Sequence, residues 1–156
     1  MADEMQMVLG SPITVVTLSA SLAAAANTYT GSGLGTELDN STLLYPYAKA
    51  VLSVPETFAA APAAGANFGL YMTRNDIDGT SDHLPVPAST DLKNAHYVGQ
   101  FPIAALDVIH LVEIVISLVG VVKAYFYIKN NTGQATTYSA SPLTVKVTPF
   151  TYKPTA

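Results

Sequence analysis

Residues 103–122, IAALDVIHLVEIVISLVGVV, decide between two kinds of fold. The stretch is mostly apolar and has the length that an α-helix needs to cross a bilayer. Three ionisable residues, Asp107, His110 and Glu113, lie near its middle. Each acid would cost about 2.5–3.5 kcal/mol at the centre of a membrane. The other residues are mostly β-branched valine and isoleucine, which favour strands. We therefore predict two strands separated by Gly120, and no membrane span.

Short stretches of similar composition recur along the rest of the chain. They are bounded by Gly, Pro, Asn and Asp turns, and several alternate apolar with polar residues as half-buried strands do. The predicted strands are 13–18, 47–54, 67–73, 97–103, 108–118, 121–129 and 143–150, with a weaker one at 34–38. Strands of this length, without a long amphipathic helix, predict an all-β fold. We expect an antiparallel β-sandwich, jelly-roll-like, of about eight strands.

The chain length of 156 residues suits one domain. Residues 1–12 show no apolar period and end in Ser-Pro, so we expect an extended N-terminal arm, ordered only where a neighbouring subunit holds it. Residues 13–156 would then form a single β-sandwich domain. The longest polar region, 74–91, is expected to be an exposed loop.

The composition points to a subunit of an assembly. Charged residues make up only 12% of the chain, about half the usual share, while hydrophobic residues make up 49%. A surface with so few charges has little protection against association, so we expect a homo-oligomer. The net charge of −4 excludes the basic surface with which proteins neutralise nucleic-acid phosphates. Cysteine is absent, which excludes disulfides and thiolate-bound metals.

One loop resembles a calcium site only superficially. Asp76, Asp78 and Asp82 surround Gly79, and their oxygens are of the type that hard cations prefer. The spacing differs from that of an EF-hand, and the glutamate at the twelfth position is missing. We interpret the segment as a solvated turn, while the sequence leaves open whether it binds a cation.

No other set of residues predicts catalysis. On a strand, Asp107 and Glu113 fall on one face and His110 on the other, so they would form neither a metal site nor an acid–base pair. No Gly-x-Ser-x-Gly elbow and no phosphate-binding loop occurs. We therefore expect no enzyme activity, no cofactor and no metal.

Tyrosines are a better indication of function. The chain has nine of them and no tryptophan. A ring on a strand packs on its neighbours while the hydroxyl reaches water or a partner. Tyr125 and Tyr127 alternate with Phe126, so we expect them to form an exposed aromatic pair. With the apolar residues of the arm they make up the candidate interface: Met5, Met7, Val8, Leu9, Tyr125 and Tyr127.

The order of the segments along the chain also resembles that in a known group of proteins. An arm and a Ser-Leu-Ala-rich segment precede an acidic turn, an Ala-rich strand, an aromatic strand, a Val-Gly-x-Phe strand, a strand ending in Asn-x-Thr-Gly, and a final strand. The segments are SLAAAA (21–26), TELDN (36–40), YAKAVLSV (47–54), FGLYM (68–72), VGQFPI (98–103) and YIKNNTGQ (127–134). This arrangement resembles that of small virion proteins of tailed bacteriophages.

The resemblance implies a capsid decoration, or cement, protein. Such a protein is a β-sandwich, often a trimer, that lies on the virion capsid surface and bridges major capsid proteins. Its binding energy would oppose expansion of the shell. Two other functions stay open. The chain could be a tail or neck adaptor, or, in a different class, a carbohydrate-binding sandwich for host adhesion, which would need exposed aromatic residues.

Overall fold

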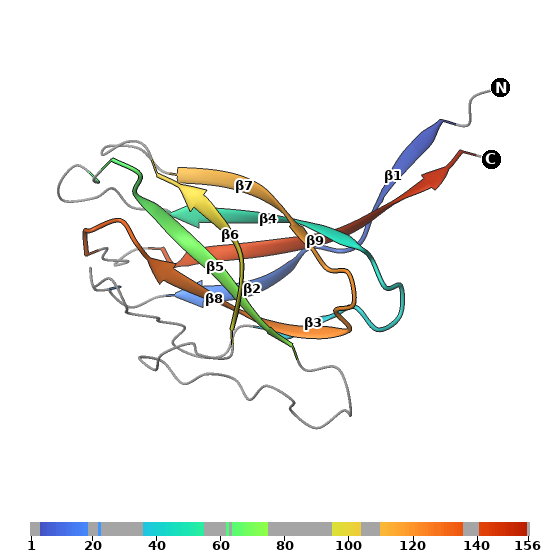
Figure 1. Cartoon of the computed structure of the whole chain (residues 1–156), viewed down its shortest axis with the longest axis horizontal. Coiled ribbons are helices and arrows are strands. Elements are labelled where there is room, and N and C mark those ends of the chain that lie inside the picture. Colours follow the sequence, from blue (N-terminus) through green and yellow to red (C-terminus); the bar gives the residue numbers. More distant parts are fainter. Residues whose placement is uncertain are drawn as a thin grey trace.

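The computed structural model describes residues 4–18, 22, 36–54, 62, 64–74, 95–103, 110–135 and 141–155. Within these residues the protein is all-β, and its nine strands form two antiparallel sheets that pack face to face (Figure 1). The predicted antiparallel β-sandwich is confirmed. No helix in this part of the chain is long and apolar enough to cross a membrane.

The two sheets contain five and four strands. In the first sheet, β1, β9, β4 and β7 are neighbours in that order, and β2 follows β1 along the same edge of β9. Its strands are β1 (Met5–Leu9), β2 (Ile13–Leu18), β4 (Tyr47–Val54), β7 (His110–Ser117) and β9 (Leu143–Pro154). The second sheet has the order β3-β8-β5-β6. Its strands are β3 (Leu38–Asp39), β5 (Asn67–Arg74), β6 (His96–Pro102) and β8 (Lys123–Asn130).

The pairing of the strands is nested. Strand β2 pairs with β9, β3 with β8, β4 with β7, and β5 with β6. A long antiparallel hairpin wrapped into two sheets gives this order, which is that of an eight-stranded jelly roll. The ninth strand, β1, is an addition to the jelly roll at the N-terminus.

The hydrophobic core lies between the sheets and follows the alternation of the strands. In β4, every second residue is buried, and the residues between them are half-buried or exposed. The inward residues of β4 are Ala48, Ala50, Leu52 and Val54. The second sheet contributes larger side chains, among them Phe68, Leu70, Phe126 and Ile128. Inward side chains of both sheets thus form one hydrophobic core, as in other β-sandwiches.

The sheets approach each other closely where β6 faces β7. A Cβ added to Gly99 in β6 would lie 2.7 Å from the Cδ1 atom of Ile114 in β7. Any larger residue at position 99 would therefore collide with that side chain unless one of them moved. Glycine at this position allows the close contact between the two sheets.

Two strands separated by a turn lie in and directly after the apolar stretch 103–122, as predicted. Strands β7 and β8 correspond to the predicted strands 108–118 and 121–129. β8 begins two residues later than predicted, and residues 108 and 109 lie outside the described part of the chain. Gly120 lies in the turn between them and has a φ of 72°, which a residue with a side chain rarely adopts. The last strand runs to Pro154, beyond the predicted end at Phe150. This extension gives the N-terminal arm its partner.

Candidate interface at the terminal ribbon

The N-terminal arm and the C-terminal end form one structure, which we call the terminal ribbon: Met5–Leu9 of β1 and Phe150–Pro154 of β9. It projects from one end of the sandwich and carries both ends of the chain (Figure 1). Hydrogen bonds flank it on both sides. The backbone N–H of Thr155 donates to the carbonyl of Glu4 at 2.8 Å, and the N–H of Gly10 donates to the carbonyl of Pro149 at 2.7 Å.

The arm is therefore extended, as predicted, but one part of that prediction is wrong. A neighbouring subunit is not required to hold residues 5–9, because their own C-terminal strand pairs with them. The arm also has a period of two, with Met5, Met7 and Leu9 on one face. The alternation is hard to see in the sequence because Val8, which lies on the other face, is also apolar.

The two faces of the ribbon differ in polarity. Met5, Met7 and Leu9 lie directly opposite Pro154, Tyr152 and Phe150. Directly opposed residues of antiparallel strands share a face, so these six residues make up one apolar face. Gln6 and Val8 lie opposite Lys153 and Thr151 on the other, mostly polar face. Among the six residues of the apolar face none carries a charge.

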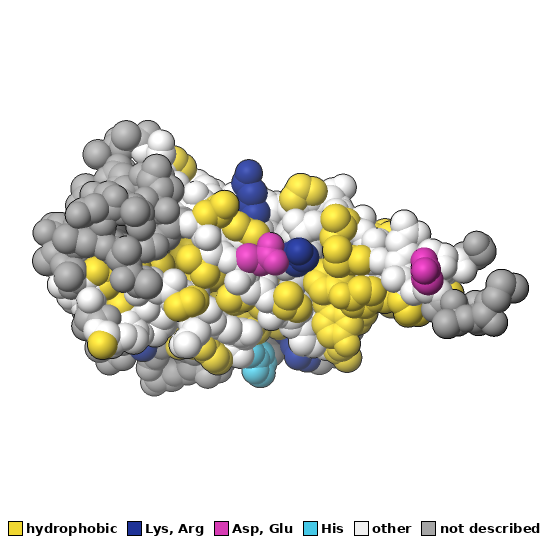
Figure 2. Space-filling model, turned by 90° about the horizontal axis from the view of Figure 1, so that it is seen from above, with side chains coloured by type: hydrophobic (Ala, Val, Ile, Leu, Met, Phe, Trp, Pro, Cys, Tyr) yellow, Lys and Arg dark blue, Asp and Glu magenta, His cyan; other side chains and the backbone are white. Residues whose placement is uncertain are grey.

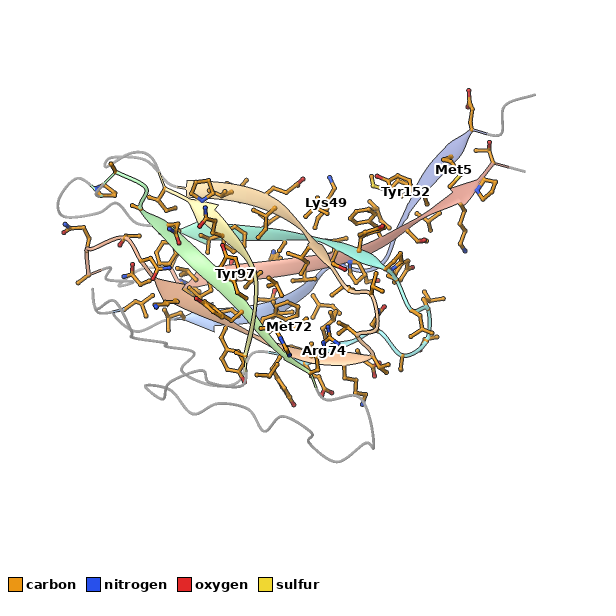
Figure 3. The ribbon with its side chains drawn as sticks, in the orientation of Figure 1. Met5, Lys49, Met72, Arg74, Tyr97 and Tyr152 are labelled. Atoms are coloured by element: carbon orange, nitrogen blue, oxygen red, sulfur yellow. The ribbon has the colours of Figure 1, made fainter. Side chains whose placement is uncertain are left out.

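Aromatic rings join the apolar face to the sandwich. Tyr47, the first residue of β4, lies opposite Phe150 and stacks on its ring with 5.6 Å between centroids. The rings of Tyr152 and Phe150 also meet, edge to face, with 5.7 Å between their centroids. Phe150 is consequently buried, while Tyr47 and Tyr152 remain exposed. Figure 3 shows Tyr152 near the base of the ribbon and Met5 farther out.

The apolar face is open to solvent. Met5 is 59% exposed, Leu9 54% and Tyr152 50%, and Met7 is also exposed. Figure 2 shows apolar side chains gathered where the ribbon leaves the sandwich. Scattered exposed apolar residues are common on protein surfaces, but a contiguous patch of them marks a contact with another molecule.

A loop at the same end of the sandwich adds two more exposed apolar side chains. Leu43 and Leu44 lie in the connection between β3 and β4, four and three residues before Tyr47, and both are more than half exposed. Leu44 has a φ of 46°, in the left-handed region that bulky residues rarely adopt. A strained and exposed leucine is unfavourable in two respects, and such strain is found more often at functional sites.

Asn40 holds this loop in place. Its side chain is buried, and its Nδ2 donates to the carbonyls of Tyr45 and Val121, each at 3.0 Å. Its Oδ1 accepts from the N–H of Tyr45 at 2.9 Å, and its backbone carbonyl accepts from the N–H of Leu44 at 3.0 Å. The loop is thereby tied to the β7–β8 turn, so the two leucines are presented on a fixed backbone.

Several charged residues of the sandwich pair with one another. Lys49 contacts Glu113 at 3.2 Å across β4 and β7, and Lys123 lies 3.7 Å from Glu37 and 3.8 Å from Asp39. The pKa of Asp39 is below its ordinary value of 3.8 because the hydroxyl and N–H of Ser41 donate to the carboxylate and Lys123 attracts it. The apolar face itself thus offers no charge for a partner to recognise.

The predicted aromatic pair is not exposed. Tyr127 is buried and Tyr125 is half-buried, so this prediction is wrong for Tyr127. Strand β8 is central in its sheet, and Tyr127 lies in a row with Tyr71 of β5 and Tyr97 of β6. Tyr97, on the edge strand, is exposed, and its ring contacts that of Tyr71 at 5.5 Å. The sequence does not show which strand lies at the edge, so it does not single out Tyr97.

Two other predicted residues, Val8 and Glu113, lie in strands but outside the apolar face. Val8 is half-buried on the polar face of the ribbon, away from Met5, Met7 and Leu9. Glu113 lies in β7 and pairs with Lys49.

The possible calcium loop, Asp76, Asp78 and Asp82, lies outside the described residues, as does Asp107. His110 is the first residue of β7. In the segments that the structure describes, no three His, Asp or Glu side chains lie close enough together to hold a metal ion.

The sequence matches no family model and no curated protein. The candidate function therefore follows from the ribbon, its apolar face and the neighbouring loop.

Proposed function

We propose that this chain is a structural virion protein, a capsid decoration or cement subunit that binds the outside of a phage head and bridges major capsid proteins. The observation that supports it most is the apolar face of the terminal ribbon, which is exposed, uncharged and continuous with Tyr47. The resemblance in segment order supports the same function, and the jelly roll is a fold that viral capsid domains use.

The shape of the molecule suits bridging. Five residue pairs in extended conformation span about 17 Å, so the ribbon reaches beyond the sandwich from which it projects. The sandwich and the ribbon can thus rest on two different capsid subunits. Each contact then raises the effective concentration of the other, and a homo-oligomer, with a trimer favoured by the resemblance, multiplies this effect.

The contact would be driven by burial of apolar surface. Met5, Leu9 and Tyr152 each have at least half of their surface exposed, and burying such a side chain contributes about 1–2 kcal/mol. Since the face carries no charge, binding should depend little on salt. Bound subunits would stabilise the shell because they bind the assembled capsid and not its dissociated subunits.

A binding experiment with matched variants tests the proposal. Undecorated capsids of the parent phage are mixed with the wild-type protein, with Met5→Ser/Tyr152→Ser, and with Leu111→Ser/Val115→Ser. Leu111 and Val115 are apolar residues of β7, at least as exposed as Met5 and Tyr152, and they serve as the control because β7 pairs with β4 and not with either strand of the ribbon. We expect the ribbon variant to bind at least tenfold more weakly and the control to bind within twofold of wild type.

Capsid heat resistance should follow the same order, highest with wild type and with the control. The proposal would be abandoned if the wild-type protein neither bound capsids nor raised their resistance to heat. Equal binding by both variants would show that the ribbon is not the surface that contacts the capsid. Imaging of the intact particle distinguishes a head subunit from a tail or neck adaptor, since the adaptor would be found at the tail.

Carbohydrate binding is the second candidate, and one observation favours it. Tyr97 is 56% exposed, and its ring packs edge to face against that of Tyr71. The two rings form an aromatic surface on the second sheet, separate from the ribbon. Sugars stack on such rings. A glycan array that gave a competable signal with the wild-type protein, and none with Tyr97→Ala, would support this function.

A further inference from the structure

The outer edge of β1 is an unprotected sheet edge. Among the strands that the structure describes, β1 has only β9 as a neighbour. Its residues, MQMVL, include no lysine and no proline. Natural proteins usually place one of these on an exposed edge strand, since the free N–H and C=O groups otherwise pair with another chain. This edge therefore has the properties of a binding surface.

The backbone bonds at the two ends of β1 show which groups face outward. In an antiparallel pair, hydrogen-bonded and non-bonded positions alternate along the strand. Glu4 bonds to Thr155, directly after β9, and Gly10 bonds to Pro149 of β9. The residues with even numbers between them, Gln6 and Val8, therefore also direct their groups toward β9. Met5, Met7 and Leu9 then direct their N–H and C=O groups away from it. These are the same residues whose side chains form the apolar face.

We propose that β1 pairs with β1 of a second copy of this chain, antiparallel and with a two-fold axis at Met7. In this register Met7 lies opposite Met7, and Met5 lies opposite Leu9 of the other copy. Every residue that directs its backbone outward meets one that does the same, so the three pairs exchange six hydrogen bonds. The two ribbons become one four-stranded sheet, and their apolar faces join on the same side of it.

Charge and strand number both favour a second copy as the occupant. Each chain has a net charge of −4, but the paired residues carry none, and the two Glu4 residues fall at opposite ends of the pairing, each opposite Gly10. No like charges therefore meet. A two-stranded ribbon is also only marginally stable in water, while three or more strands are stable.

The expected size of the contact is small. Gly10, which would lie opposite Glu4 of the other copy, has no side chain and lines a groove of about 530 Å³ at the base of the ribbon together with Leu9, Tyr45 and Pro149. Pairing of two five-residue edges buries much less than the roughly 800 Å² per partner of a standard interface. We therefore expect a weak dimer, formed at high protein concentration or when subunits are held side by side.

Single cysteines test this register, because the chain has none of its own. In the proposed pairing, the Cα atoms of the two residues at position 7 are about 5.5 Å apart, within the range of a disulfide. Two residues at position 5 would be about 14 Å apart. Under mild oxidation we expect Met7→Cys to form disulfide dimers and Met5→Cys to stay monomeric. A mixture of Met5→Cys and Leu9→Cys should form the mixed dimer.

Sedimentation of the protein without cysteines gives a second measurement. The average mass of the wild type and of Met7→Leu should rise above 16.3 kDa with concentration. Met7→Pro should stay at that mass, since it loses an outward N–H and none of the bonds to β9. Circular dichroism confirms that each variant is folded.

The pairing is wrong if Met5→Cys is cross-linked as fast as Met7→Cys, or if the wild type stays monomeric at every concentration and Met7→Cys is not cross-linked. Neither measurement uses a capsid. Failure of capsid binding would therefore leave this inference standing, and failure of the pairing would leave the proposed function standing.

Discussion

Leu44 is the one residue with a side chain that has a positive φ among those that the structure describes. A left-handed conformation costs a residue with a side chain about 1–2 kcal/mol, and Leu44 adopts it with φ at 46°. Asn40 fixes it there through the bonds to Leu44 and Tyr45. The neighbouring Leu43 has similar exposure without a positive φ, so the pair offers a matched comparison.

Replacing Leu44 with glycine should therefore stabilise the protein. Glycine removes the strain, and its own entropic cost is about 0.5–1 kcal/mol, so we expect a net gain of about 0.5–1 kcal/mol in the free energy of unfolding. Leu43→Gly should lose about the same amount. Urea denaturation measures both. Equal losses in the two variants would show that no strain is stored at Leu44.

Asp39 should make stability depend on pH in the acidic range. Its pKa is lowered in the folded state, chiefly by the Ser41 hydroxyl, then by the Ser41 N–H and by Lys123. A lowered pKa contributes stability that is complete above the unfolded value, about 3.9, and is lost as the pH falls through the folded value.

An NMR titration of the Asp39 carboxyl should give a pKa below 3.8 in the wild type and a higher one in Ser41→Ala. In Asp39→Asn, the free energy of unfolding should fall less steeply between about pH 5 and pH 2. The effect is small, since Asp39 is exposed. A wild-type pKa at or above the ordinary value would contradict the role given to Ser41.

At the scale of elements, local pattern predicted most of the strands. β4, in which buried residues alternate with more exposed ones, occupies the predicted range, and Pro55 follows its end. The pattern failed where the outcome depends on a distant partner. The sequence did not predict β1 as a strand because its partner, β9, lies at the other end of the chain. It predicted an exposed Tyr127 because the sequence of β8 does not show that this strand lies between two others in its sheet.

The contact between β6 and β7 makes a testable pair. Gly99→Ala should lower the free energy of unfolding by about 1–2 kcal/mol, because the new Cβ would meet Cδ1 of Ile114 at 2.7 Å. Ile114→Val removes exactly that atom and should cost about 0.5–1.5 kcal/mol alone. The double variant should lose less free energy of unfolding than the sum of the two single losses, by about 0.5 kcal/mol or more. Additive losses would mean that the two residues do not touch.

At the scale of the whole molecule, the ribbon and the sandwich contribute differently. The core lies between the sheets, and none of its buried residues belongs to β1. The sandwich should therefore fold without the arm, while binding should not survive its loss.

Deletion of residues 1–9 should leave one cooperative unfolding transition and cost about 2 kcal/mol or less. Calorimetry measures the transition, and the capsid assay described above measures the binding. A variant that no longer unfolds cooperatively would show that the ribbon is part of the folding unit.

The nested pairing of the strands also determines when the protein can fold. β2 is the first strand of the jelly roll to leave the ribosome, and its partner β9 is the last. The first sheet lacks a central strand until residues 143–150 have been synthesised, since β9 lies between β2 and β4, and the second sheet lacks β8 until residues 123–130 have been synthesised. The nascent chain thus holds its apolar strands without their final partners during most of translation. Folding dominated by such distant pairs is slow, so the sandwich closes only after β9 has emerged, and partly folded chains are most exposed to aggregation before that point.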